Sequence, residues 1–130
     1  MKVDLGLLFF RAGVSGVMAF SHGLPKLMSF SEKASLFPDP LGVGSSVSLG
    51  LTIFAEFVCA LLVLTGIFAR EACIPLVITM GVAAFHIHSS DPFAKKELSL
   101  IYLISFLALF LTGPGAFSIG KGKLRIGFKS

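Results

Sequence analysis

Hydrophobic residues gather in four long stretches, and the segments between them hold most of the polar residues. The stretches cover approximately residues 5–21, 47–68, 72–88 and 97–113. A helix needs about 20 apolar residues to cross the ~30 Å hydrocarbon layer of a bilayer, and each stretch approaches or exceeds that length. The pattern predicts an all-α integral membrane protein, a four-helix bundle whose antiparallel helices run up-down-up-down.

Two charged residues interrupt these stretches. Arg11 lies inside the first stretch, and Glu56 lies near the centre of the second. A charged side chain at the bilayer centre costs roughly 2.5–3.5 kcal/mol on insertion scales, so each needs a partner or a purpose. Both residues fall near mid-depth, and we expect them to form an ion pair. That pair would either fix the helix register or anchor a ligand head group or a proton path, and the sequence leaves both interpretations open.

Two neighbouring faces of the first stretch differ in character. At helical spacing, one face is formed by Arg11, Ser15, Met18 and His22. The adjacent face carries the small residues Ala12, Gly16, Ala19 and Gly23. Small residues at this spacing let a second membrane helix approach closely. The first helix is therefore expected to turn both faces toward the interior of the bundle.

The connecting segments are expected to lie at the membrane surface. Pro25 is expected to end the first helix, so residues 25–46 are predicted to form an interfacial loop with room for one short helix. Residues 69–71 are predicted to form a tight turn. A basic tail, residues 116–130, belongs to the same single domain, residues 1–130.

The composition supports lipid as the solvent and the bilayer as the main partner. Hydrophobic residues make up 55% of the chain and charged residues 14%, against about 25% charged in a typical soluble domain. The mean hydropathy is +0.91. No basic patch is interleaved with aromatic residues, so nucleic acid is not an expected partner. Arg11 within the first stretch and Asp4 before it favour a membrane helix over a cleaved signal peptide.

The basic residues predict an orientation in the membrane. Four spans place both termini on one side, together with six basic residues, whereas the other side holds four. The positive-inside rule then places both termini in the cytoplasm, and the expected location is a bacterial inner membrane.

This topology gathers polar side chains at the outer ends of the helices. We expect a polar funnel with Arg11 and Glu56 at its floor. Its upper wall would hold His22, Lys26, His86 and Glu97, with His88 a weaker candidate. Residues two apart on a helix do not share a face, so the sequence does not decide whether His86 or His88 faces the interior. It predicts no metal site, and Glu97 also suits the positive end of the helix dipole at the start of the fourth helix.

The assembled residues resemble the DoxX family of small four-helix membrane proteins. The first half of the resemblance rests on Arg11, Gly16, the cluster His22–Gly23–x–x–Lys26 and Glu56. The second half rests on Leu64–Thr65–Gly66, Arg70, Met80, Ala83 with a following histidine, Glu97 and Gly113–Pro114–Gly115. The chain departs from the family pattern at two places. Cys59 and Ala60 replace glycines, and Ser118–Ile119–Gly120 stands where an aspartate is common.

The resemblance implies a membrane protein associated with redox chemistry. A related subunit, DoxD, belongs to a thiosulfate:quinone oxidoreductase. The first hypothesis is therefore an accessory subunit, rather than a complete enzyme, that binds a quinone in the funnel beside a partner oxidoreductase. In that hypothesis His86 exchanges protons with the quinone. Haem ligated by a histidine is an alternative cofactor.

The second hypothesis needs no redox role. The chain would scaffold a partner, or would bind or transport a small solute. The small-residue face of the first helix would then serve packing or contacts in a homo-oligomer.

Overall fold

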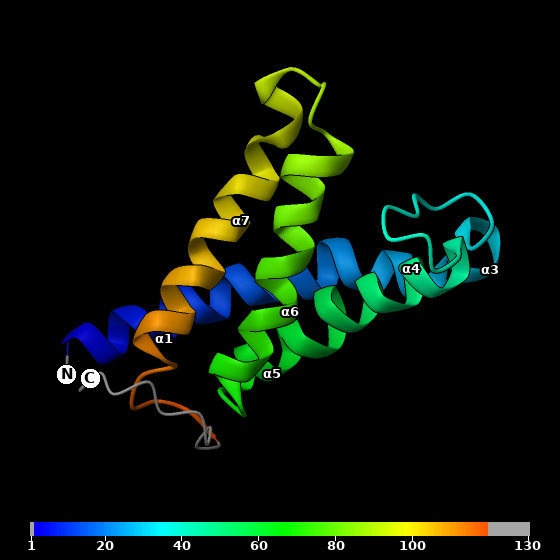
Figure 1. Cartoon of the computed structure of the whole chain (residues 1–130). Coiled ribbons are helices and arrows are strands. Elements are labelled where there is room, and N and C mark those ends of the chain that lie inside the picture. Colours follow the sequence, from blue (N-terminus) through cyan, green and yellow to red (C-terminus); the bar gives the residue numbers. More distant parts are fainter. Residues whose placement is uncertain (1, 120–130) are drawn as a thin grey trace.

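The computed structural model describes residues 2–119, and every regular element within this range is a helix (Figure 1). The α-helices are α1 (Lys2–Val17), α2 (Leu24–Met28), α3 (Phe30–Lys33), α4 (Ser45–Ile53), α5 (Ala60–Thr65), α6 (Ala69–Val82) and α7 (Phe93–Thr112). Three π-helical segments join or extend them: η1 (Met18–Gly23), η2 (Phe54–Cys59) and η3 (Ala83–Ile87). The predicted all-α class is confirmed. Lys121, Lys123, Arg125 and Lys129 of the predicted basic tail lie outside the described residues.

Among the described residues, three continuous helices are long and apolar enough to cross a membrane. They are Lys2–Met28, Ser45–Thr65 and Ala69–Ile87. Helix α7 is also long, with 20 residues, but charged side chains occupy its first turns. The predicted four-helix antiparallel bundle therefore stays a prediction, whereas three helices meet the length and composition of a membrane span.

The helices form two hairpins that cross each other (Figure 1). In the first hairpin, α1, η1 and α2 lie antiparallel to α4, η2 and α5. In the second, α6 packs along α7. The hairpins meet where α1 contacts the end of α5 and the segment that follows α7, and they diverge from there. This divergence, rather than a uniform bundle, creates the space in which polar side chains gather.

A buried arginine joins the helices where the hairpins meet. The side chain of Arg11 is only 2% exposed. Its Nε donates a hydrogen bond to the carbonyl of Leu64 (3.3 Å), Nη1 donates to the carbonyl of Pro114, and Nη2 donates to the carbonyl of Phe117 (2.6 Å). Arg11 therefore fastens α1 to the end of α5 and to the segment that follows α7.

The end of α5 is fully hydrogen-bonded because of these contacts. Gly66, at φ +85°, closes the helix, and its amide donates to the carbonyls of Leu62 and Val63. Arg11 satisfies the carbonyl of Leu64, and the amide of Ile119 satisfies that of Thr65 (2.9 Å). The last four carbonyls of a helix have no partner within it, and lipid offers none.

Several predicted helix boundaries differ from the structure. The fourth helix begins at Phe93 rather than at residue 97, and the second ends at Thr65 rather than at residue 68. The first helix does not end at Pro25 but continues to Met28. The π-helical segment η1 ends just before Pro25, and the change of hydrogen-bond register there accommodates a residue without an N–H. Residues 69–71 are the first turn of α6, because Gly66 and Phe68 adopt left-handed conformations and make the turn earlier.

The small-residue face of the first helix makes close contact at Gly23. A methyl group added there would lie 2.5 Å from the carbonyl oxygen of Glu56 and 2.7 Å from the amide nitrogen of Phe57. Ala19 is also fully buried. Gly16, on the same predicted face, has open space around its Cα. The close approach therefore occurs where η1 crosses η2.

Gly23→Ala is expected to destabilise the protein by about 1–3 kcal/mol, because the backbone of η2 must move to admit the methyl group. Gly16→Ala is the matched control, since it adds the same group in open space and gains up to ~1 kcal/mol of helix propensity. Unfolding in mixed detergent micelles measures both changes. Equal effects of the two substitutions would contradict the close crossing at Gly23.

Arg11→Met is expected to lower the free energy of unfolding by about 3 kcal/mol or more. The substitution leaves the carbonyls of Leu64, Pro114 and Phe117 without a hydrogen-bond donor, and each unpaired carbonyl costs roughly 1–3 kcal/mol. Arg11→Lys should recover only part of the loss, since one ammonium group does not reproduce the guanidinium fork. The free energy of unfolding measures both. Lys2→Met, at an exposed position of the same helix, controls for loss of charge and should change little.

Candidate functional site

The predicted pair of Arg11 and Glu56 does not form. Glu56 instead binds Lys26, whose Nζ lies 2.6 Å from Oε1 of the carboxylate. The reason is that Arg11 and Glu56 lie at different positions along the axis of the hairpin. Glu56 lies beside Gly23 in the antiparallel hairpin, and Arg11 precedes Gly23 by 12 residues, about 18 Å along a helix. The first helix extends further than the sequence predicted, so Lys26 rather than Arg11 reaches the acid.

The π-helical segments bring the acid and its neighbours together. Segment η1 carries His22, and segment η2, which packs against it, carries Glu56. A π-helical turn inserts an extra residue and redirects the side chains that follow, and such turns are frequent at functional sites. Glu56 is 4% exposed, whereas a quarter of the Lys26 side chain is exposed. The buried carboxylate thus holds a partly accessible cation.

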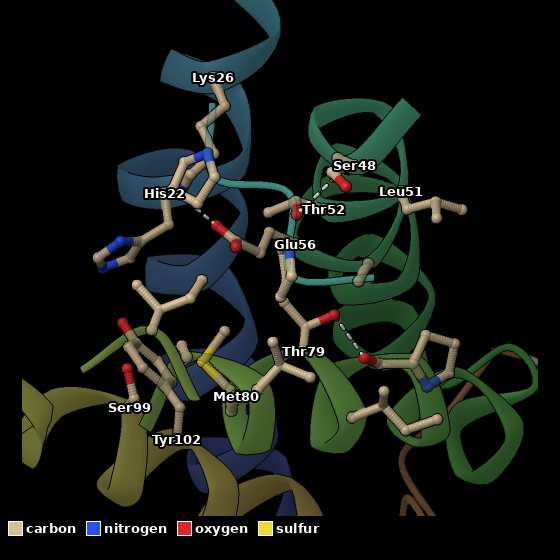
Figure 2. A pocket seen from close by; sticks show the side chains of 18 of the residues that line it. His22, Lys26, Ser48, Leu51, Thr52, Glu56, Thr79, Met80, Ser99 and Tyr102 are labelled. Atoms are coloured by element: carbon tan, nitrogen blue, oxygen red, sulfur yellow. Dashed lines mark hydrogen bonds and ion pairs between the residues drawn. The ribbon is translucent and has the colours of Figure 1, made fainter. Parts of the chain in front are cut away.

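Tyr102 of α7 completes the cluster from the second hairpin. Its ring meets the His22 ring edge to face, with centroids 5.5 Å apart and an interplanar angle of 82°. The Tyr102 ring also stacks on the Phe106 ring, with centroids 6.0 Å apart, and this contact holds the Tyr102 ring in position. Figure 2 shows His22 of η1, Lys26 of α2, Glu56 of η2 and Tyr102 of α7 at the cavity, with a dashed line between Lys26 and Glu56.

These side chains line a cavity of about 660 Å³ between the two hairpins. Its other walls are mainly apolar and come from α4, α6 and the loop before α4. The hydroxyls of Thr52 and Thr79 donate to carbonyls of their own helices, Ser48 (2.9 Å) and Pro75 (2.7 Å). The volume falls in the range of small-molecule sites, which combine apolar walls with a few placed polar groups.

A loop covers part of the cavity. Phe37, Pro38, Pro40 and Leu41 line it from the segment between α3 and α4. Asp39 fixes this loop by accepting hydrogen bonds from the Ser48 hydroxyl (2.7 Å) and from the amides of Gly44 (2.8 Å) and Val43 (3.0 Å). Hydrogen bonds from the Ser48 side chain and the Gly44 amide hold the pKa of Asp39 below its usual value.

Of the predicted funnel residues, the structure brings His22, Lys26 and Glu56 together and leaves the other three apart. Arg11 is at the opposite end of the first helix. Glu97 is exposed and outside the cavity.

His86, in η3, and His88, directly after that segment, lie at different cavities, so the structure decides the choice that the sequence left open. His86 is exposed and lines a neighbouring cavity of about 320 Å³. His88 lines the large cavity and binds Asp91 through Nδ1 (2.7 Å). The π-helical turn of η3 ends just before His88, so the α-helical spacing does not describe where these side chains lie.

Sequence reasoning missed Tyr102, whereas it had offered Phe37 and Leu41 as residues that lie on the membrane surface or cap the mouth of the bundle, and both line the cavity. Tyr102 is the one tyrosine of the chain, and its hydroxyl within an apolar stretch was the available signal. Within residues 2–119, His, Cys, Asp and Glu side chains form no group of three or more that could hold a metal ion.

Comparison with known proteins places this arrangement in a family. The family model of DoxX matches residues 6–89. The chain belongs to the DoxX family. An uncharacterized membrane protein of Mycobacterium tuberculosis (strain ATCC 25618 / H37Rv) is 28% identical over 82% of this chain and 74% of its own length. No solved structure matches. With its apolar helices and a membrane relative, this DoxX protein is an integral membrane protein in contact with the lipid bilayer.

Eight of the residues that carry the DoxX resemblance form two groups in space. Arg11, Gly66, Arg70 and Gly113 lie where the hairpins meet, and Arg70 Nη2 donates to the carbonyl of Thr112 (3.3 Å). His22, Gly23, Lys26 and Glu56 lie at the cavity. The first group holds the fold together, and the second forms the polar part of the candidate site.

A double-mutant cycle distinguishes the observed ion pair from the predicted one. Lys26→Met and Glu56→Gln should show a coupling free energy of about 1–3 kcal/mol, because the two groups touch. Arg11→Met and Glu56→Gln should be additive within ~0.5 kcal/mol, because they share no partner. Unfolding of the single and double variants in detergent measures both. Strong coupling of Arg11 with Glu56 would contradict the structure.

Proposed function

We propose that this DoxX protein is an accessory membrane subunit that binds a quinone, or a similar lipid-soluble molecule, in the cavity between its hairpins. One observation carries the proposal. The cluster of His22, Lys26, Glu56 and Tyr102 lies inside a cavity of about 660 Å³ whose other walls are mainly apolar. An amphipathic molecule matches this combination, because its head meets hydrogen-bonding groups and its remainder meets hydrocarbon.

The chemistry of the cluster suits an oxygen-bearing aromatic head group. Lys26 offers N–H donors to a carbonyl oxygen, while imidazole and phenol groups can each donate or accept. Glu56 orients Lys26 and offsets its charge. Tyr102 and His22 present aromatic rings at the same place, so a flat head group finds both stacking and polar partners.

The redox association rests on the family resemblance. The DoxX-like subunit of a thiosulfate:quinone oxidoreductase links this type of chain to quinones, and a partner oxidoreductase subunit would then supply the chemistry. In this proposal His22 takes the place beside the ligand that the sequence suggested for His86, because it is His22 that lines the large cavity.

We further propose that α7 is a fourth span and that residues 1–130 form one antiparallel domain with both termini in the cytoplasm of a bacterial cell. One contact supports an even number of spans. The amide of Ala116, beyond α7, donates to the carboxylate of Asp4 near the start of α1 (3.0 Å). The charge asymmetry of the sequence supports the orientation. A homo-oligomer is compatible with this arrangement.

Tyr102 offers a direct measurement of binding. The chain has one tyrosine and no tryptophan. The tyrosine fluorescence of the protein in vesicles of pure lipid therefore comes from Tyr102 and reports on the cavity. A benzoquinone is expected to quench this fluorescence saturably. Glu56→Gln and His22→Phe should each weaken binding about tenfold, equivalent to ~1.4 kcal/mol, whereas Glu32→Gln at an exposed position should not.

Small molecules extracted from the purified protein and identified by mass spectrometry complete the test. A quinone near one per chain supports the proposal. Haem would assign the histidines a different role. Lipid alone, with no quenching by quinone, would contradict the proposal and favour the scaffold or small-solute hypothesis.

A further inference from the structure

The wall of the cavity between α4 and α6 is open to the surroundings. Leu51, Phe54 and Ile78 all line the cavity, yet they are 53%, 48% and 60% exposed. A side chain that faces a cavity and is also half exposed stands at its mouth. We call these three residues the side mouth. Figure 2 shows Leu51 pointing away from Glu56, toward the outside of the helix pair.

The side mouth lies near the middle of the membrane. Phe54 follows the first residue of its spanning helix, Ser45, by nine residues, and Ile78 follows Ala69 by nine. Nine residues of helix rise about 14 Å, close to half of the ~30 Å hydrocarbon layer. At this depth we expect lipid around the mouth.

The approach at the end of the helices is partly covered, although Leu41 of the loop lines the cavity and is itself 68% exposed. The loop residues Phe37 and Leu41 lie over the cavity, and Asp39 fastens the loop to the beginning of α4. A solute arriving from water through the covered part would have to displace this fastened apolar loop. A molecule dissolved in the bilayer meets the side mouth without displacing the loop.

The polarity of the cavity changes along the same path. Lys26, Glu56, His22 and Tyr102 lie within, whereas the side mouth is entirely apolar. A ligand that follows this gradient keeps its polar head inside and its hydrocarbon outside.

We infer that the ligand carries a long apolar tail, that it enters sideways from the lipid between α4 and α6, and that its tail remains in the side mouth while its head reaches the Lys26–Glu56 pair. This inference rests on the proposed function, since it assumes that the cavity binds a lipid-soluble molecule. To the proposed function it adds that the ligand has a long apolar tail rather than a compact shape, and that the ligand enters through the side mouth.

Two probes test the inference: both have the same benzoquinone head, and one of them has a ten-carbon tail. Binding is measured by the quenching of Tyr102 fluorescence. The probe concentration is expressed as a mole fraction in the lipid, so that partitioning into the bilayer does not count as binding. The tailed probe should bind about tenfold more tightly. Ile78→Phe and Leu51→Phe narrow the mouth, so each should remove most of that advantage and leave the tailless probe unchanged. Ile104→Phe is the matched control on α7, because Ile104 is 66% exposed and lies outside the cavity.

Equal binding of the two probes, or equal weakening of both by Ile78→Phe, would overturn the inference while leaving the binding site intact. No quenching by either probe in the unmodified protein would instead overturn the proposed function. The two failures are therefore distinguishable.

A second measurement needs no ligand. Ile78→Trp gives the chain its one tryptophan, and vesicles of phosphatidylcholine brominated at mid-chain should quench it as strongly as they quench Ile104→Trp. A tryptophan at position 78 that is shielded from the brominated lipid would show that the mouth faces protein or water, and would overturn the sideways route.

Discussion

The guanidinium group of Arg11 determines how the four long helices of this DoxX protein meet. It is buried, and its three recorded hydrogen bonds go to backbone carbonyls rather than to a carboxylate. Helix C-termini carry partial negative charge and unpaired carbonyls. The end of α5 and the segment after α7 both present such groups to one cation. In lipid no water could take over this role, so the contact fixes which helix ends must be neighbours.

This constraint acts at one end of the molecule and leaves the other end free to open. Arg11, Arg70 and the glycine turns hold the hairpins together at the chain termini. Away from that point the hairpins diverge, and the space between them becomes the cavity. The closed end accounts for stability, whereas the open end offers a place for a ligand. The crossing at Gly23 separates the two, because it holds η1 against η2 at the level of Glu56.

The Lys26–Glu56 pair shows why a buried charge was correctly suspected but wrongly paired. An acid in an apolar stretch must have a partner for reasons of solvation, and this holds whatever the fold. Which partner it has depends on the relative shift of two helices. That shift follows from the close crossing at Gly23 and from the continuation of the helix through Pro25, and both arise from π-helical geometry. An α-helical wheel does not contain this information.

The sequence by itself determined the membrane location, the helical class, the family and the identity of the charged residues that need partners, because hydrophobicity and solvation cost are properties of each residue and its neighbours along the chain. It also indicated the close approach at the small-residue face and three of the cavity residues. Only the tertiary structure decided that Arg11 holds helix ends, that Lys26 holds Glu56, that Tyr102 and the Asp39 loop complete the site, and that His88 rather than His86 faces it. These depend on how the two hairpins cross, and that crossing is set by contacts between residues far apart in the chain.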